Sequence, residues 1–175
     1  MQQYSDRKEP AERAFAQAFR LQTAGNLEEA ERLYRRSIAL YPTAEAFTFL
    51  AWTLSFSNRL EEAVQLCHRA IEIDPDFGNP YNDIGAYFIQ LGRLEDAIPW
   101  LERAKHSKRY DCYHYPYYNL GRIYEQMGRF PQALAEYSGA VERAREKQVD
   151  YPHASHAVKR VEAILRNQTP PQETV

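Results

Sequence analysis

The chain repeats a short motif at a nearly constant interval. A leucine or phenylalanine followed three residues later by alanine recurs at a near-constant interval, and the spacings between successive alanines of this series are 33, 34 and 36 residues, for Ala30, Ala63, Ala97 and Ala133. A turn precedes each motif, with glycine at positions 25, 92 and 128 and asparagine at position 58. These two residue types best tolerate the left-handed backbone at helix ends. A regular period of this length constrains the fold to a stacked array of similar units.

Each unit contains two segments with helical periodicity. In residues 79–91, for example, Tyr81, Ile84 and Phe88 fall at i, i+3 and i+7 on one apolar stripe, and residues 94–104 repeat this spacing. A helix with one apolar stripe cannot bury it alone, so we expect successive hairpins to stack. Small residues at a second equivalent position would let the paired helices approach closely: Ala18, Ala51, Gly85 and Gly121.

The fourth unit carries the most specific pattern. Residues 117–124 read Tyr-Tyr-Asn-Leu-Gly-Arg-Ile-Tyr and are followed by Ala133 and Tyr137. The chain therefore resembles the tetratricopeptide-repeat (TPR) family, whose pattern is aromatic-x2-Leu-Gly-x2-Tyr, then Ala-x3-Phe, then Pro. The resemblance covers about residues 11–148, and it implies an all-α fold: a right-handed α-solenoid of about four TPR helix-turn-helix hairpins plus a C-terminal capping helix.

The pattern also sets the expected boundaries along the chain. We expect a flexible segment at 1–9, a repeat domain at 10–148 with units at about 11–43, 44–77, 78–113 and 114–148, a capping helix at 149–167, and a disordered tail at 168–175. The third unit departs from the rule, because residues 105–116 make its interval two residues longer than the ideal. This insertion is either a binding loop or a helix extension with a longer turn whose tyrosines pack between helices.

The composition favours no nucleic-acid or membrane partner. The net charge is −2, the first ten residues are polar, and the sequence has no run of 18 apolar residues. Two cysteines are too few for a disulfide framework. We therefore expect a cytoplasmic protein with reduced thiols.

No motif in the chain predicts catalysis or a cofactor. The sequence lacks a phosphate-binding Gly-rich loop, a Gly-x-Ser-x-Gly motif and a His-Glu-x-x-His motif. Cys112 and His114, with His106 nearby, resemble metal ligands but fall short of a tetrahedral set, so we expect no metal. Cys67 lies four residues after Ala63, where the repeat has a core residue, and is expected to be buried. We predict a protein that is not an enzyme.

The family resemblance implies that the first helices of successive hairpins line a concave groove. Carrying groove positions over by pattern gives twelve candidate partner-binding residues, in an aromatic half and a polar half: Phe19, Phe49, Trp52 and Phe56, then Asn82, Asp83, Gln90, Tyr115, Tyr118, Asn119, Arg122 and Glu125. Large aromatic side chains are candidate anchors, and amide side chains can bond to an extended peptide. Chaperone-binding members of the family hold a C-terminal carboxylate with a Lys/Asn/Arg clamp, but here Phe15 and Phe19 stand where its first Lys and Asn would be.

Three functions remain open at this point. The leading prediction is a protein-protein interaction scaffold or adaptor that binds a peptide or partner protein in the groove. The alternatives are a self-associating structural protein that uses the aromatic half, which would form a homo-oligomer, and a non-catalytic regulatory subunit of an enzyme complex. The sequence does not identify the partner.

Overall fold

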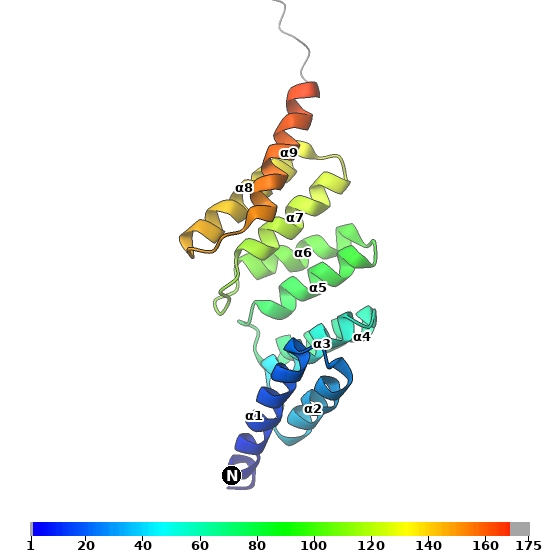
Figure 1. Ribbon diagram of the computed structural model, residues 1–175, viewed down its shortest axis with the longest axis vertical. Helices are drawn as coiled ribbons and strands as arrows, with labels where there is room; N and C mark the ends of the chain where they lie inside the picture. Colours follow the sequence, from blue (N-terminus) through cyan, green and yellow to red (C-terminus); the bar gives the residue numbers. More distant parts are fainter. Residues whose placement is uncertain (1, 169–175) are drawn as a thin grey trace, which may run out of the picture.

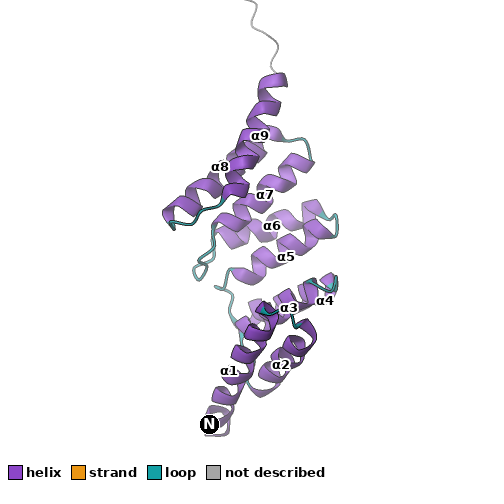
Figure 2. Cartoon of the chain, viewed as in Figure 1, coloured by secondary structure: helices purple, strands orange, loops and turns teal. Residues whose placement is uncertain are grey.

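The computed structural model describes residues 2–168, with side chains from residue 7 onward. Over this part of the chain it contains nine α-helices and no strand, which confirms the all-α helical-repeat solenoid (Figures 1 and 2). The helices are α1 (Gln2–Thr23), α2 (Leu27–Leu40), α3 (Ala44–Ser55), α4 (Leu60–Ile73), α5 (Asn79–Gln90), α6 (Leu94–Lys105), α7 (His114–Gln126), α8 (Phe130–Glu146) and α9 (Pro152–Gln168).

The helices pair into four hairpins that stack in sequence order. The pairs are α1 with α2, α3 with α4, α5 with α6 and α7 with α8, and the second helix of each pair also packs on the next hairpin. The first helices contact one another as well, α1 with α3, α3 with α5 and α5 with α7. We call the side of the array formed by these four helices the inner face. Helix α9 packs on α8 at the end of the stack (Figure 1).

The turns inside the hairpins adopt the left-handed backbone that the sequence predicts. The φ angles are 81° at Gly25, 74° at Gly92 and 71° at Gly128, and Asn58 has a φ of 56°. Each of these residues lies in the turn that connects the first helix of its hairpin to the second. The recurrent glycine or asparagine is therefore explained by local backbone geometry.

Close approach between paired helices explains the small residues of the repeat. A Cβ on Gly85 would lie 2.4 Å from Leu101 Cδ2, and one on Gly121 would lie 2.5 Å from Tyr137 Cδ1. The alanines at the two equivalent positions of the repeat are fully buried: Ala18, Ala51, Ala30, Ala63, Ala97 and Ala133. Cys67 is also fully buried, as predicted. The glycine and alanine positions lie in the interior of the stack, where the helices approach so closely that only a hydrogen atom or a methyl group fits.

The two ends of the array differ from the expected boundaries. Helix α1 already begins at Gln2, so it includes residues 2–9 of the segment that was expected to precede the repeat domain. Ion pairs at i, i+4 spacing, Lys8 with Glu12 and Glu9 with Arg13, favour this extension of the helix. At the other end, the helix expected at 149–167 corresponds to α9 at Pro152–Gln168, and the rest of the expected tail lies outside the described residues.

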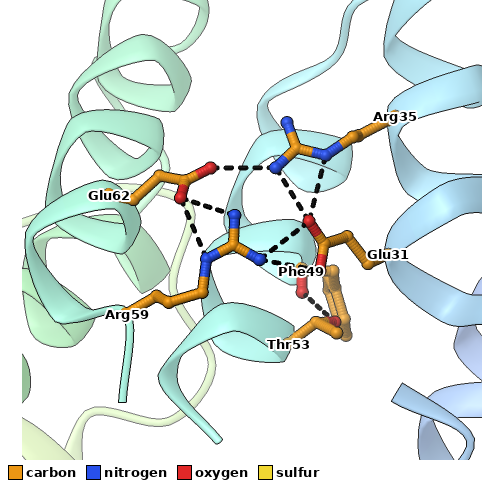
Figure 3. Close-up of polar contacts among 6 residues, drawn as sticks. All are labelled: Glu31, Arg35, Phe49, Thr53, Arg59 and Glu62. Carbon is orange, nitrogen blue, oxygen red and sulfur yellow. Dashed lines mark hydrogen bonds and ion pairs between the residues drawn. The ribbon is translucent and has the colours of Figure 1, made fainter. Parts of the chain in front are cut away.

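An ion-pair network connects the first two hairpins on the side opposite the inner face. Arg35 of α2 contacts Glu31 and Glu62, both at 2.8 Å, and Arg59 contacts Glu31 at 3.0 Å and Glu62 at 2.6 Å (Figure 3). All four side chains are partly open to solvent, so the network contributes modestly to stability and more to the alignment of α2 with α4.

The insertion forms a loop at residues 106–113 instead of extending a helix. The Arg109 N–H donates to the Asp76 carbonyl oxygen at 3.0 Å, and the Gly78 N–H donates to the Arg109 carbonyl oxygen at 3.0 Å. The Arg109 side chain also pairs with Asp74 at 2.6 Å and Glu45 at 2.8 Å. These contacts fold the loop back onto the junction between α4 and α5. Within the insertion, a loop thus joins α6, which ends at Lys105, to α7, which begins at His114, and Tyr110 in this loop packs against Tyr81 and Ala104.

Candidate functional site

The aromatic candidates form one continuous row on the inner face. The Phe19 ring lies 5.5 Å from the Phe49 ring, Phe49 lies 5.9 Å from Trp52, and Trp52 lies 5.7 Å from Phe56. Phe15 joins the row from α1, 5.4 Å from Phe49. Trp52 is 42% exposed and Phe56 is 57% exposed. We call Phe19, Phe49, Trp52 and Phe56 the aromatic row. The structure thus brings together the four residues that the sequence placed in the aromatic half.

A cavity opens where the aromatic row meets α5 and α7. Its volume is about 320 Å³, and its lining comes from α3, α5, α7 and the 106–113 loop: Thr48, Phe49, Trp52, Asn79, Asn82, Asp83, Tyr110, Cys112 and Tyr115. We call it the groove cavity. Five of the lining residues were candidates from the sequence. Of the other lining residues, Tyr110 and Cys112 lie in the 106–113 loop, and the unusual sequence of this loop was the signal that could have suggested them.

Asp83 places a carboxyl group in the wall of this cavity. Its neighbours are largely apolar or neutral, and its one side-chain hydrogen bond comes from Asn82 Nδ2, at 3.5 Å. Burial raises the pKa of the Asp83 carboxyl to about 7, because desolvation disfavours the charged form and the amide only partly offsets it. A carboxyl group in a cavity whose pKa is raised to near 7 is a common feature of functional sites.

A chain of hydrogen bonds connects Asp83 to α7. The Asn119 Nδ2 group donates to Asn82 Oδ1 at 3.1 Å, and the Arg122 guanidinium donates to Asn119 Oδ1 at 3.4 Å. Both asparagines are buried, so their amides are largely used within the protein. The polar half of the predicted groove is therefore partly internal. Arg122 and the exposed Gln90 at the end of α5 present the more accessible polar groups.

Tyr118 and Glu125 are held by the last part of the chain. Tyr118 lies 5.3 Å from the ring of Tyr151, which precedes α9. Glu125 accepts hydrogen bonds at 2.7 Å from Tyr137 Oη and from the guanidinium of Arg160 in α9. The Arg160 contact holds the pKa of the Glu125 carboxyl below its usual range. These two candidates thus connect the fourth hairpin to the chain that follows it.

Tyr115 differs from Tyr118 because it remains accessible. Its side chain is 42% exposed and lines the groove cavity, with its ring 4.3 Å from the ring of His114 and 5.7 Å from that of Tyr151. His114 itself is buried beneath it. The cavity is therefore bounded by Tyr115 on α7 and by Phe49 and Trp52 of the aromatic row on α3.

No group of three or more His, Cys, Asp or Glu side chains within residues 7–168 is placed to hold a metal ion, and Cys112 forms no disulfide. No helix in the described part of the chain is long and apolar enough to cross a membrane.

Comparisons with known sequences agree on the repeat. Models of the tetratricopeptide repeat match residues 21–84 and residues 115–147. The chain is 38% identical over 74 residues to the TPR repeat-containing thioredoxin TTL4 of Arabidopsis thaliana, which covers 42% of this chain and 11% of that protein. It is 26% identical over 133 residues to the BBSome complex member BBS4 of Bos taurus, which covers 75% of this chain and 25% of that protein. The chain thus spans a quarter or less of these relatives.

Solved structures share the fold at low sequence identity. The pilF protein of Pseudomonas aeruginosa superposes with a TM-score of 0.83 at 20% identity, over 93% of this chain and 72% of that chain. The protein YrrB, described as a TPR protein with an unusual peptide-binding site, gives a TM-score of 0.64 at 18% identity, over 89% of this chain and 77% of that chain.

Proposed function

Because this chain belongs to the tetratricopeptide-repeat family, we propose that it is a non-catalytic scaffold that binds a peptide or partner-protein segment on its inner face. A solenoid of this kind supports a role in protein interaction in general. The finer proposal is that the aromatic row and the groove cavity together form the binding surface. No residue is assigned a catalytic role.

The observation that carries the proposal is the exposure of the aromatic row. Phe19 is 41% exposed, Trp52 42% and Phe56 57%, and each of the three rings contacts another ring of the row. Scattered exposed apolar residues are ordinary, but a contiguous row next to a cavity is typical of a docking surface. Burying one such side chain fully contributes roughly 1.5–3 kcal/mol, so a few rings suffice to anchor a peptide.

Peptide selection with Trp52→Ala as the key variant tests the proposal. Peptides of about twelve residues would be selected from a random displayed library on the purified full chain and then measured by fluorescence polarisation. We expect Trp52→Ala to weaken the selected peptides at least about tenfold, because truncating a central aromatic anchor commonly costs more than 1–2 kcal/mol.

The matched control is Ile73→Ala, since Ile73 is an exposed apolar residue at the end of α4, outside the aromatic row and the cavity lining. Its affinity for the peptides should equal that of the wild type. If Trp52→Ala and Phe56→Ala both bind the selected peptides as tightly as the wild type does, the binding surface lies elsewhere and the proposal fails.

The aromatic row also supports a second candidate function, self-association. Two copies that placed their exposed rings against each other would bury Trp52 and Phe56 at once. Sedimentation at several protein concentrations separates the two functions. A dimer that dissociates on dilution and is lost in Phe56→Ala favours self-association, whereas a monomer at all concentrations favours the peptide scaffold.

A further inference from the structure

The groove cavity contains a negative charge that the protein leaves without a cationic partner. Among the described residues no lysine or arginine forms an ion pair with Asp83, and no basic residue appears in the lining of the cavity. The nearby cations are engaged elsewhere: Arg109 pairs with Asp74 and Glu45, and Arg122 donates to Asn119. Placing a carboxylate in such surroundings costs stability, and a cationic ligand that entered the cavity would offset this cost.

The aromatic residues that line the rest of the cavity also favour a positively charged ligand. Four of the lining residues are aromatic: Phe49, Trp52, Tyr110 and Tyr115. The face of an aromatic ring attracts a cation through its quadrupole, most strongly for tryptophan and tyrosine, and the attraction grows where water is excluded. The combination of several rings with one carboxylate is complementary to a long side chain with an apolar stem and a charged end.

The size of the cavity limits what can enter it. Its volume of about 320 Å³ lies at the small end of the range for small-molecule sites, which is about 300–1,000 Å³. A single long side chain fits this volume, whereas a folded element does not. The exposed aromatic row, adjacent to the cavity through Phe49 and Trp52, would hold the neighbouring residues of the same peptide.

We propose that the groove cavity receives a lysine or arginine side chain of the bound peptide, with its charged group on the Asp83 carboxylate and its stem against Trp52 and Tyr115. This inference rests on the proposed function and specifies its ligand as a peptide with a basic residue beside apolar ones. Asp83 supplies the charge, and the rings supply the apolar and cation–π contacts.

Binding of such a side chain is coupled to the loss of a proton. In the free protein the Asp83 carboxyl has a pKa of about 7, so a fraction of it is protonated near neutrality, and an incoming cation favours the charged form. The groups that face Asp83 from the surrounding elements are neutral thiols and phenols together with one arginine at the end of the amide chain: Cys67, Tyr87, Tyr110, Cys112, Tyr115 and Arg122. Affinity is therefore expected to fall as the pH drops from 7.5 to 5.5.

Parallel peptide selections on three proteins test the inference. The wild type, Asp83→Asn and the control Asp96→Asn, an exposed position on α6, would each be used at pH 7.5 with the same random library. We expect lysine or arginine to be enriched at one position with the wild type and with Asp96→Asn. With Asp83→Asn, peptides should still be selected but without that enrichment, because the asparagine keeps the shape and removes the charge.

A selected peptide then serves as its own probe. Replacing its arginine by citrulline, or its lysine by norleucine, should weaken binding to the wild type about tenfold and binding to Asp83→Asn several-fold less than that, because only the cation–π contacts with the rings are then lost. Enrichment that is absent with the wild type, or that persists with Asp83→Asn, would overturn the inference while leaving the groove function standing. If the wild type selects no peptide at all, the proposed function fails and the inference falls with it.

Discussion

Replacing Asp83 by asparagine is expected to stabilise the free protein at neutral and alkaline pH. The folded state raises the pKa of this carboxyl to about 7 by burying it, whereas an exposed aspartate in the unfolded chain has a pKa of about 3.9. At pH values between these two pKa values, the Asp83 carboxyl binds more protons in the folded state than in the unfolded state. The stability of the wild type therefore falls as the pH rises through this window, and the asparagine variant lacks this contribution.

The magnitude follows from the width of the window. Between pH 5 and 7 the unfolded carboxyl is ionised and the folded one is mostly protonated, so each pH unit changes the free energy of unfolding by at most about 1.4 kcal/mol. Partial ionisation of the folded group near pH 7 reduces the total to about 2 kcal/mol. The stability advantage of Asp83→Asn over the wild type should grow by this amount from pH 5 to pH 7 and level off above about pH 8.

Urea unfolding followed by circular dichroism at several pH values between 5 and 8 measures the effect. The difference between variant and wild type at each pH removes the contributions of the other titrating groups, which both proteins share. Asp96→Asn, at an exposed position paired with Arg93, is the control and should show a difference that does not change with pH. A pH-independent difference for Asp83→Asn, or an asparagine variant less stable than the wild type at pH 8, would refute the account of Asp83 as a desolvated carboxyl.

Three further substitutions test the fold. Gly121→Ala should lower the free energy of unfolding by about 1–3 kcal/mol, because its Cβ would lie 2.5 Å from Tyr137 Cδ1; a neutral result in urea unfolding would mean that α7 and α8 can move apart freely. Tyr34→Phe should cost about 1 kcal/mol, since it removes the 2.7 Å hydrogen bond to Gln22 Oε1, and an unchanged unfolding midpoint would contradict this. Arg59→Ala should lower the free energy of unfolding only slightly, and the difference should shrink in 1 M NaCl, because its ion pairs are partly exposed; a salt-independent loss would point to an apolar role of its stem.

Much of the fold could be predicted because its determinants are local and repeated. The turn residues Gly25 and Asn58 depend on the backbone of one hairpin, and the small residues Gly85 and Gly121 depend on contacts within a single hairpin, between its first and second helix. The aromatic row was predictable for the same reason, since equivalent positions of successive first helices fall on one face. The helical residues 2–9 were missed, because a polar terminal segment has no apolar periodicity to reveal it.

The groove cavity depends on contacts between residues distant in the sequence. Its loop wall is held by Arg109, which pairs with Asp74 at a separation of 35 residues and with Glu45 at a separation of 64. Tyr110 and Cys112 reach the cavity only because of this fold-back, and no periodicity in the sequence encodes it. Likewise, the contact of Glu125 with Arg160 in α9 joins segments that the repeat pattern treats separately.

The sequence by itself determined the architecture, the order of the hairpins and the face that carries the aromatic side chains, because a 34-residue period leaves few ways to bury its stripes. Only the tertiary structure decided which of those side chains remain accessible and what surrounds Asp83. Solvent access and desolvation are properties of all the neighbours at once, and several of those neighbours come from a loop whose path is set by long-range ion pairs. The electrostatic character of the groove is therefore a tertiary property of a fold that the repeat alone specifies.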